Sequence, residues 1–228
     1  MVIIIPGWMH AASEWKQVSD LLRERQIEHA VLDIPGFGTV PPDPAINTLT
    51  DLCQWCASEI DRLQRPSTSP LVLFGHSCGG RVAVQLVATG LEVQHLILSG
   101  SPNLYRPSFK TKLVKALAAF GRPFKRLVPE QLRQKFRSAD FAAARDTQML
   151  ALYQSVVTGD QRDILPNISA KTTLLWGERD EAAPLSIAQE MLPLIAGSQL
   201  AIIPHAGHNL HHEKPQLLTA KITTYVAT

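Results

Sequence analysis

The sequence predicts an α/β fold in which a mostly parallel sheet is flanked by helices and interrupted by an inserted helical cap. Short apolar runs alternate with amphipathic stretches along most of the 228 residues, a pattern typical of parallel strands connected by helices. The alternation stops between residues 103 and 166, where the pattern is helical throughout, and then resumes. We therefore expect a core made of residues 1–102 and 167–228, with residues 103–166 as the cap.

The first elements follow directly from their residues. Residues 2–5 read Val-Ile-Ile-Ile and stop at Pro-Gly, which predicts a buried strand. Residues 13–25 gather large apolar side chains on one helical face. Residues 30–34 form the next apolar run, which ends at Pro-Gly-Phe-Gly, so we expect a second strand there.

A loop, a helix, a strand and a second helix follow. Residues 40–45 contain three prolines and are predicted to be a loop. Thr48 or Thr50 can cap a helix that continues to about residue 64. Residues 71–74 are predicted to be a strand. The helix after it, which continues to about residue 89, is apolar nearly all round, so we expect it to be buried.

The remaining elements complete a sheet of about six strands. Residues 93–98 form a strand closed by Ser-Gly-Ser-Pro. After the cap, strands are predicted at 172–176 and 199–203, with helices at 184–194 and from about residue 214.

Composition and charge exclude several classes of protein. A net charge of +2 gives no bulk attraction for nucleic acid, and no apolar run reaches the ~18 residues of a membrane span. Three cysteines, Cys53, Cys56 and Cys78, are too few for a disulfide framework. The N-terminus lacks the basic segment of a signal peptide. We expect a cytoplasmic protein with no nucleic-acid partner and no integral membrane segment.

The segment Gly-His-Ser-Cys-Gly at residues 75–79 carries the strongest chemical signal. The Gly-x-Ser-x-Gly pattern is weak alone, but here it lies between a predicted strand and a predicted helix, where a nucleophile elbow must be. In such a turn the residues two positions either side of the serine must have almost no side chain. Gly75 and Gly79 meet that demand, so Ser77 is the predicted nucleophile.

A serine nucleophile needs a base that is held by an acid. In folds with this elbow the chain order is serine, acid, histidine. Asp180 follows the strand at 172–176 and His208 follows the last strand, so all three groups are expected at the carboxyl edge of the sheet. His205, His211 and His212 stand beside His208, but no cysteine or carboxylate pair completes a metal site with them. We therefore expect no metal and no cofactor.

The sequence resembles the α/β-hydrolase superfamily along nearly its whole length. The resemblance rests on five segments in the family's order, at residues 5–8, 33–38, 75–80, 175–180 and 206–208. It is strongest to small capped carboxylesterases, including the carrier-protein methyl ester esterases of biotin synthesis. It implies a triad of Ser77, Asp180 and His208, and an oxyanion hole formed by the backbone N–H groups of Trp8 and Cys78. Because the chain begins at the oxyanion strand, we expect a parallel sheet of six strands.

The resemblance implies a serine hydrolase that cleaves carboxylic esters of short to medium acyl chains through an acyl-enzyme. Lactone hydrolysis and the cleavage of carrier-protein methyl esters stay open as alternatives, followed by acyl transfer, perhydrolysis and a non-catalytic receptor. The predicted pocket residues are Met9, His10, Phe37, Leu104 and Tyr105. Residues 104–165 hold twelve Lys or Arg against five Asp or Glu, which fits either solvated helix faces or docking of an acidic carrier protein.

Overall fold

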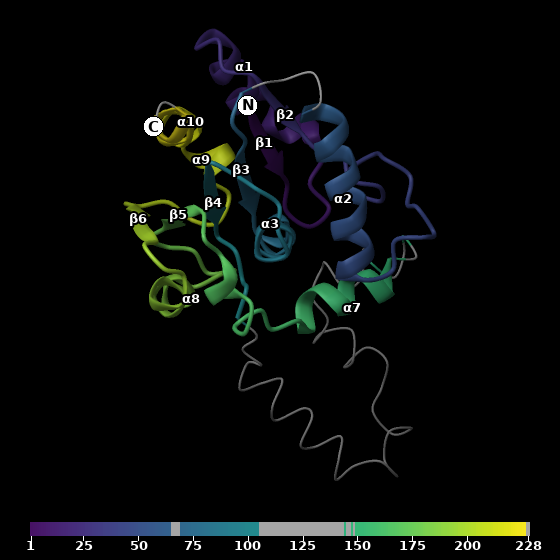
Figure 1. Ribbon diagram of the computed structural model, residues 1–228. Helices are drawn as coiled ribbons and strands as arrows, with labels where there is room; N and C mark the ends of the chain where they lie inside the picture. The colour runs from purple at the N-terminus through teal and green to yellow at the C-terminus, as the bar shows by residue number, and fades with distance from the viewer. Residues whose placement is uncertain (65–68, 105–143, 145–146, 148, 227–228) are drawn as a thin grey trace, which may run out of the picture.

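The computed structural model describes residues 1–64, 69–104, 144, 147 and 149–226, and its centre is one parallel sheet (Figure 1). The strand order is β2-β1-β3-β4-β5-β6, and each neighbouring pair is parallel. The strands are β1 (Val2–Ile5), β2 (His29–Val31), β3 (Val72–His76), β4 (His95–Ser99), β5 (Lys171–Gly177) and β6 (Gln199–Ile203). The predicted six-stranded parallel sheet is therefore confirmed.

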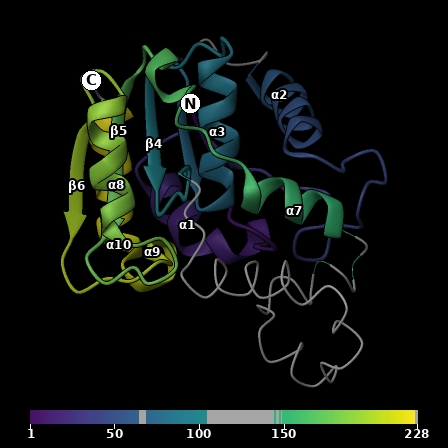
Figure 2. The same cartoon turned by 90° about the horizontal axis from the view of Figure 1, so that it is seen from below.

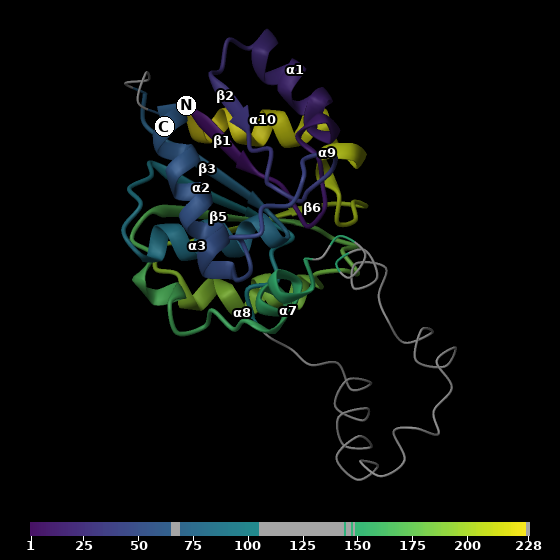
Figure 3. The same cartoon turned by 90° about the vertical axis from the view of Figure 1, so that its right-hand side faces the viewer.

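Helices cover both faces of this sheet. One face carries α1 (Lys16–Glu24), the short α9 (Leu210–Glu213) and α10 (Pro215–Val226), and α1 contacts α10 (Figure 3). On the other face α2 (Leu49–Gln64), α3 (Cys78–Ala88) and α8 (Leu185–Met191) lie side by side (Figure 2). The described residues also contain three short 3₁₀ turns, at Ala12–Trp15, Leu165–Asn167 and Leu192–Leu194.

The core divides between the two faces because successive side chains of a strand point to opposite sides. In β1, Val2 and Ile4 pack with the α1 and α10 side chains, whereas Ile3 and Ile5 pack with those of α2 and α3. All four β1 residues are buried. This two-sided burial explains why β1 reads as a continuous apolar run instead of an alternating one.

The structure corrects two of the predicted boundaries. β2 is only three residues long, because this edge strand pairs with β1 alone and leaves it after Leu32. The helix predicted at 184–194 ends at Met191 and continues as a 3₁₀ turn that contains Pro193, since proline cannot donate a helical hydrogen bond. In the described part of 103–166 the helical pattern breaks at Gly159, a predicted helix breaker, and residues 159–164 form no helix.

The part of the predicted cap that the structure describes includes α7 (Leu150–Thr158). This helix contacts α2, and the backbone N–H of Leu49 donates to Ser155 Oγ at 2.9 Å. Most of the basic residues of the predicted cap fall at 105–143, outside the described residues. Within the described chain, we find no helix that combines the length and apolar character needed to cross a membrane.

Candidate active site

Ser77 occupies the sharp turn between β3 and α3. Its backbone has φ 51° and ψ −117°, a region that non-glycine residues rarely adopt and that costs of order 1–3 kcal/mol. Three hydrogen bonds hold the turn: Ser77 N–H donates to Ser99 O at 2.9 Å, and Ser77 O accepts from Gly80 N at 3.0 Å and Ser101 Oγ at 3.2 Å. The strain is maintained by the surrounding fold, as expected for a site that needs an exposed hydroxyl.

The glycines on either side of Ser77 have no room for a side chain. A Cβ at Gly75 would lie 2.6 Å from Gly80 Cα, and a Cβ at Gly79 would lie 2.1 Å from Ile5 O. Both contacts are with backbone, which cannot swing away as a flexible side chain does. The spacing seen in the sequence therefore has a steric cause in the structure.

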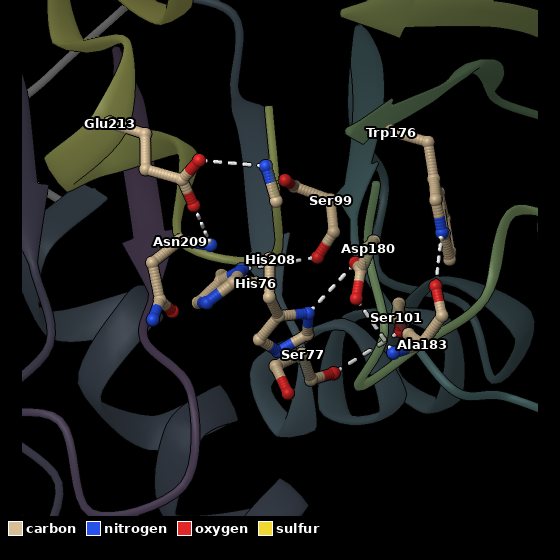
Figure 4. Close-up of polar contacts among 11 residues, drawn as sticks. His76, Ser77, Ser99, Ser101, Trp176, Asp180, Ala183, His208, Asn209 and Glu213 are labelled. Carbon is tan, nitrogen blue, oxygen red and sulfur yellow. Dashed lines mark hydrogen bonds and ion pairs between the residues drawn. The ribbon is translucent and has the colours of Figure 1, made fainter. Parts of the chain in front are cut away.

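Asp180 and His208 form a close pair at the carboxyl ends of β5 and β6. His208 Nδ1 lies 2.8 Å from Asp180 Oδ2, and Asp180 Oδ1 accepts the N–H of Ala183 at 2.7 Å. The Asp180 side chain is 1% exposed and that of His208 is 20% exposed. Figure 4 shows the His208 ring between Asp180 and Ser77. This arrangement orients one ring nitrogen toward the carboxylate and leaves the other on the serine side.

Glu213 fixes the loop that carries His208. Its Oε2 accepts the N–H of Gly207 at 2.7 Å and its Oε1 accepts the N–H of Asn209 at 3.2 Å (Figure 4). The carboxylate therefore clamps the residues on both sides of His208. Glu213 has no role assigned from the sequence, because its contact with the His208 loop becomes visible only once that loop is folded.

Gly100 is a site residue that the sequence analysis does not single out. It has φ +55°, and a Cβ there would lie 2.9 Å from both Asp180 Oδ2 and His208 Nδ1. The position combines left-handed backbone with a close approach to the pair. Its only sequence signal is the Ser-Gly-Ser-Pro turn after β4.

A cavity of about 550 Å³ opens beside Ser77. The residues that line it come from segments spread along the described chain and are Gly7, Trp8, His10, His76, Ser77, Cys78, Arg81, Pro102, Leu104, Tyr153, Val156, Val157, Ala182, Pro184, Ile187, His208 and Asn209. The predicted oxyanion residues, Trp8 and Cys78, are both on this wall.

The structure places some of the predicted pocket residues on the cavity wall and others elsewhere. His10 and Leu104 line the cavity, but Met9 and Phe37 are not among its lining residues. Phe37 is buried and packs edge-on against Trp8, with ring centroids 5.2 Å apart. It therefore supports a wall residue from behind. Tyr105 lies outside the described residues.

Two histidines beside the site are buried, and their burial disfavours the charged form of the ring. His76 packs 4.8 Å from the His208 ring, and burial holds the pKa of His76 well below its ordinary value. His211 stacks on Trp15 at 4.3 Å, and burial, followed by repulsion from other histidines, lowers its pKa to about 3. Both rings are therefore uncharged near neutral pH, which limits the positive charge next to His208.

Two clusters of side chains in the described residues have metal-ligand spacing. One consists of His10, His76 and His211, and the other of Glu14, His211 and His212, with the ligand atoms of each cluster within 4.8 Å of one another. The sequence grouping of His205 with His208 is not reproduced, because His205 faces Arg179 and His208 faces Asp180.

The Cys-x-x-Cys pair is part of the core. Cys53 and Cys56 are buried free thiols on α2. Burial raises the pKa of Cys53 to about 12, which disfavours the reactive thiolate. These two cysteines therefore belong to the hydrophobic core and have no sign of a redox role.

A family model described as "Alpha/beta hydrolase family" matches residues 2–221. The chain belongs to this family. Two similar curated proteins are a pimeloyl-[acyl-carrier protein] methyl ester esterase of Vibrio vulnificus and a 2-succinyl-6-hydroxy-2,4-cyclohexadiene-1-carboxylate synthase of Escherichia coli. The first is 22% identical and the match covers 98% of this chain and 93% of the relative. The second is 23% identical, with 97% and 91% covered.

Solved structures of other proteins have the same fold as this chain. An esterase from Exiguobacterium antarcticum superimposes with a TM-score of 0.76 at 21% identity, covering 100% of this chain and 91% of the esterase. At this identity the likeness establishes the fold. The activity has to be argued from the site.

Proposed function

We propose that this family member is a serine hydrolase that cleaves carboxylic esters of short to medium acyl chains. The observation that carries the proposal is that Ser77 and His208 line one cavity, with Ser77 on a strained elbow and His208 Nδ1 2.8 Å from the buried carboxylate of Asp180. The cavity volume of about 550 Å³ is within the usual range for small-molecule sites.

The proposed mechanism uses each group once per half-reaction. Ser77 Oγ attacks the ester carbonyl while His208 accepts its proton, and Asp180 stabilises the charged imidazole. The N–H groups of Trp8 and Cys78 would donate to the oxyanion, each worth about 3 kcal/mol. His208 then protonates the leaving alcohol, and a water that gives its proton to His208 releases the acid.

A second candidate is the cleavage of a methyl ester whose acyl group is attached to a carrier protein. The Vibrio vulnificus relative is named for that activity, and the basic excess of residues 104–165 is the complement of an acidic carrier. We propose that residues 103–166 form a cap over the site. Turnover of a carrier-bound ester should then fall steeply as salt is raised, whereas turnover of a free ester should not.

Hydrolysis of p-nitrophenyl butyrate tests the proposal. The purified wild type should turn over, and Ser77→Ala should lose at least about a thousandfold in kcat. Ser58→Ala removes an exposed serine on α2 and serves as the matched control. A phosphonate ester should add its mass to the wild type and to the control, but not to Ser77→Ala. A folded wild type that neither turns over nor is labelled would contradict the proposal.

A further inference from the structure

Arg81 is a buried cation on the wall of the cavity beside Ser77. It lies on α3, four residues after Ser77, and only 2% of it is exposed. Of the described residues that line the cavity, it is the one Arg, Lys, Asp or Glu. Burying a guanidinium without a counter-ion is costly, so its surroundings need an explanation.

The described contacts of Arg81 use little of its hydrogen-bonding capacity. A guanidinium has five N–H donors. Nη1 donates to Gly159 O at 2.7 Å, while Nε is buried and has no acceptor among the described residues. Burial lowers the pKa of Arg81, and the charge of Asp160 opposes this shift. Asp160, however, is already paired with Arg162 at 2.9 Å.

A purely structural role does not require this charge. The segment that follows α7 is already attached to α3 by neutral groups: Gln161 Nε2 donates to Arg81 O at 2.8 Å, and Asn103 Nδ2 donates to Gln161 Oε1 at 2.8 Å. The bond from Arg81 to Gly159 adds one more contact to this network. An anionic ligand in the cavity would accept hydrogen bonds from the remaining N–H groups of the Arg81 guanidinium.

We propose that Arg81 binds an anionic group of the substrate, so that the preferred esters are monoesters of dicarboxylic acids. This rests on the ester hydrolysis proposed above. Ser77 immediately precedes α3 and Arg81 follows four residues later, a rise of roughly 6 Å along the helix axis, and both residues line the same cavity. The second carboxylate therefore belongs a few bonds from the scissile carbonyl. A planar guanidinium suits such a carboxylate because it can donate two parallel hydrogen bonds.

The test compares monomethyl adipate, which carries a carboxylate, with dimethyl adipate, which does not. In the wild type, kcat/KM for the monoester should exceed that for the diester by about tenfold or more. Arg81→Met should abolish this preference, and Arg81→Lys should restore part of it. Arg62→Met, which removes an exposed arginine on α2, should leave the ratio unchanged. The diester reports any general damage, because a structural role alone would lower both rates and leave the ratio intact.

Binding measured without turnover separates this proposal from the proposed esterase activity. Calorimetry of monomethyl adipate on Ser77→Ala should show binding that weakens about tenfold or more in Ser77→Ala/Arg81→Met. If the wild type hydrolyses neither adipate ester nor p-nitrophenyl butyrate but this difference persists, the esterase proposal fails and the anion site stands. If both esters are hydrolysed with a ratio that Arg81→Met does not change, the anion site is refuted.

Discussion

The Asp180–His208 pair can be disturbed without removing either residue, by placing a methyl group at Gly100. The new Cβ would lie 2.9 Å from Asp180 Oδ2 and from His208 Nδ1. An ordinary contact begins near 3.4 Å, so the pair has to move by about 0.5 Å. A misplacement approaching 1 Å can cost about a hundredfold in rate. We therefore expect Gly100→Ala to lose between about tenfold and a hundredfold in kcat.

The backbone strain of this substitution has a matched control elsewhere in the chain. Gly100 has φ +55° and Gly197 has φ +68°, and a Cβ at Gly197 would meet nothing within 4 Å. Left-handed backbone costs a non-glycine residue roughly 1–2 kcal/mol, so both variants should lose about that much unfolding free energy. For a chain of this size the loss corresponds to a fall in Tm of roughly 2–8 °C.

The assay measures kcat for p-nitrophenyl butyrate and Tm for the two variants side by side. Gly197→Ala should show this fall in Tm and keep its activity, whereas Gly100→Ala, whose Cβ also meets the Asp180–His208 pair, should show at least as large a fall and lose activity. Equal kcat values for Gly100→Ala and Gly197→Ala would refute the reasoning, because the Asp180–His208 contact would then be dispensable for the reaction.

Two further predictions concern the neighbours of His208. Glu213→Gln weakens the hydrogen bond to Gly207, so kcat should fall by roughly tenfold with little change in KM. Glu59→Gln on α2 is the control, and equal kcat values for the two variants would contradict the role of Glu213 in holding the His208 loop. Unfolded His211 binds a proton below pH 6.5, whereas folded His211 stays neutral down to about pH 3. Its contribution to the unfolding free energy should therefore fall by about 1.4 kcal/mol for each unit by which the pH is lowered from 6.5 to about 3. His211→Phe should make the slope of urea-derived stability against pH shallower there, and an unchanged slope would contradict this.

The sequence predicts those features of the fold and site that depend on local pattern. The strands are detected because β-branched runs end at turn residues, and Gly75 and Gly79 are informative because their spacing is fixed by one turn. Asp180 and His208 could be placed at strand ends, and the pairing of β5 with β6 brings those ends together.

Gly100 and Arg81 could not be found in this way. The constraint on Gly100 comes from side chains that are 80 and 108 residues away in sequence, and no local pattern reports such an approach. Arg81 stands in a helix whose other residues are apolar except for Gln85, and a single arginine at such a position is usually solvated. Among the described residues, the segment that follows α7 covers it: Arg81 Nη1 donates to Gly159 O, and Gln161 Nε2 donates to Arg81 O.

The position of Arg81 gives α3 three separate contributions to the site. The turn at its start holds Ser77, its first residue, Cys78, lines the cavity and carries one of the proposed oxyanion N–H groups, and its first full turn brings Arg81 to the same cavity. Because the backbones of all three residues belong to one helix and the turn at its start, that backbone holds them a short distance apart. An ester whose second carboxylate reached Arg81 would therefore have its carbonyl fixed relative to Ser77, so Arg81→Met should lower kcat for the monoester as well as raise its KM. If Arg81→Met changed KM alone, the contact between Arg81 and the carboxylate would stabilise the bound substrate and the transition state equally, and would take no part in positioning the carbonyl.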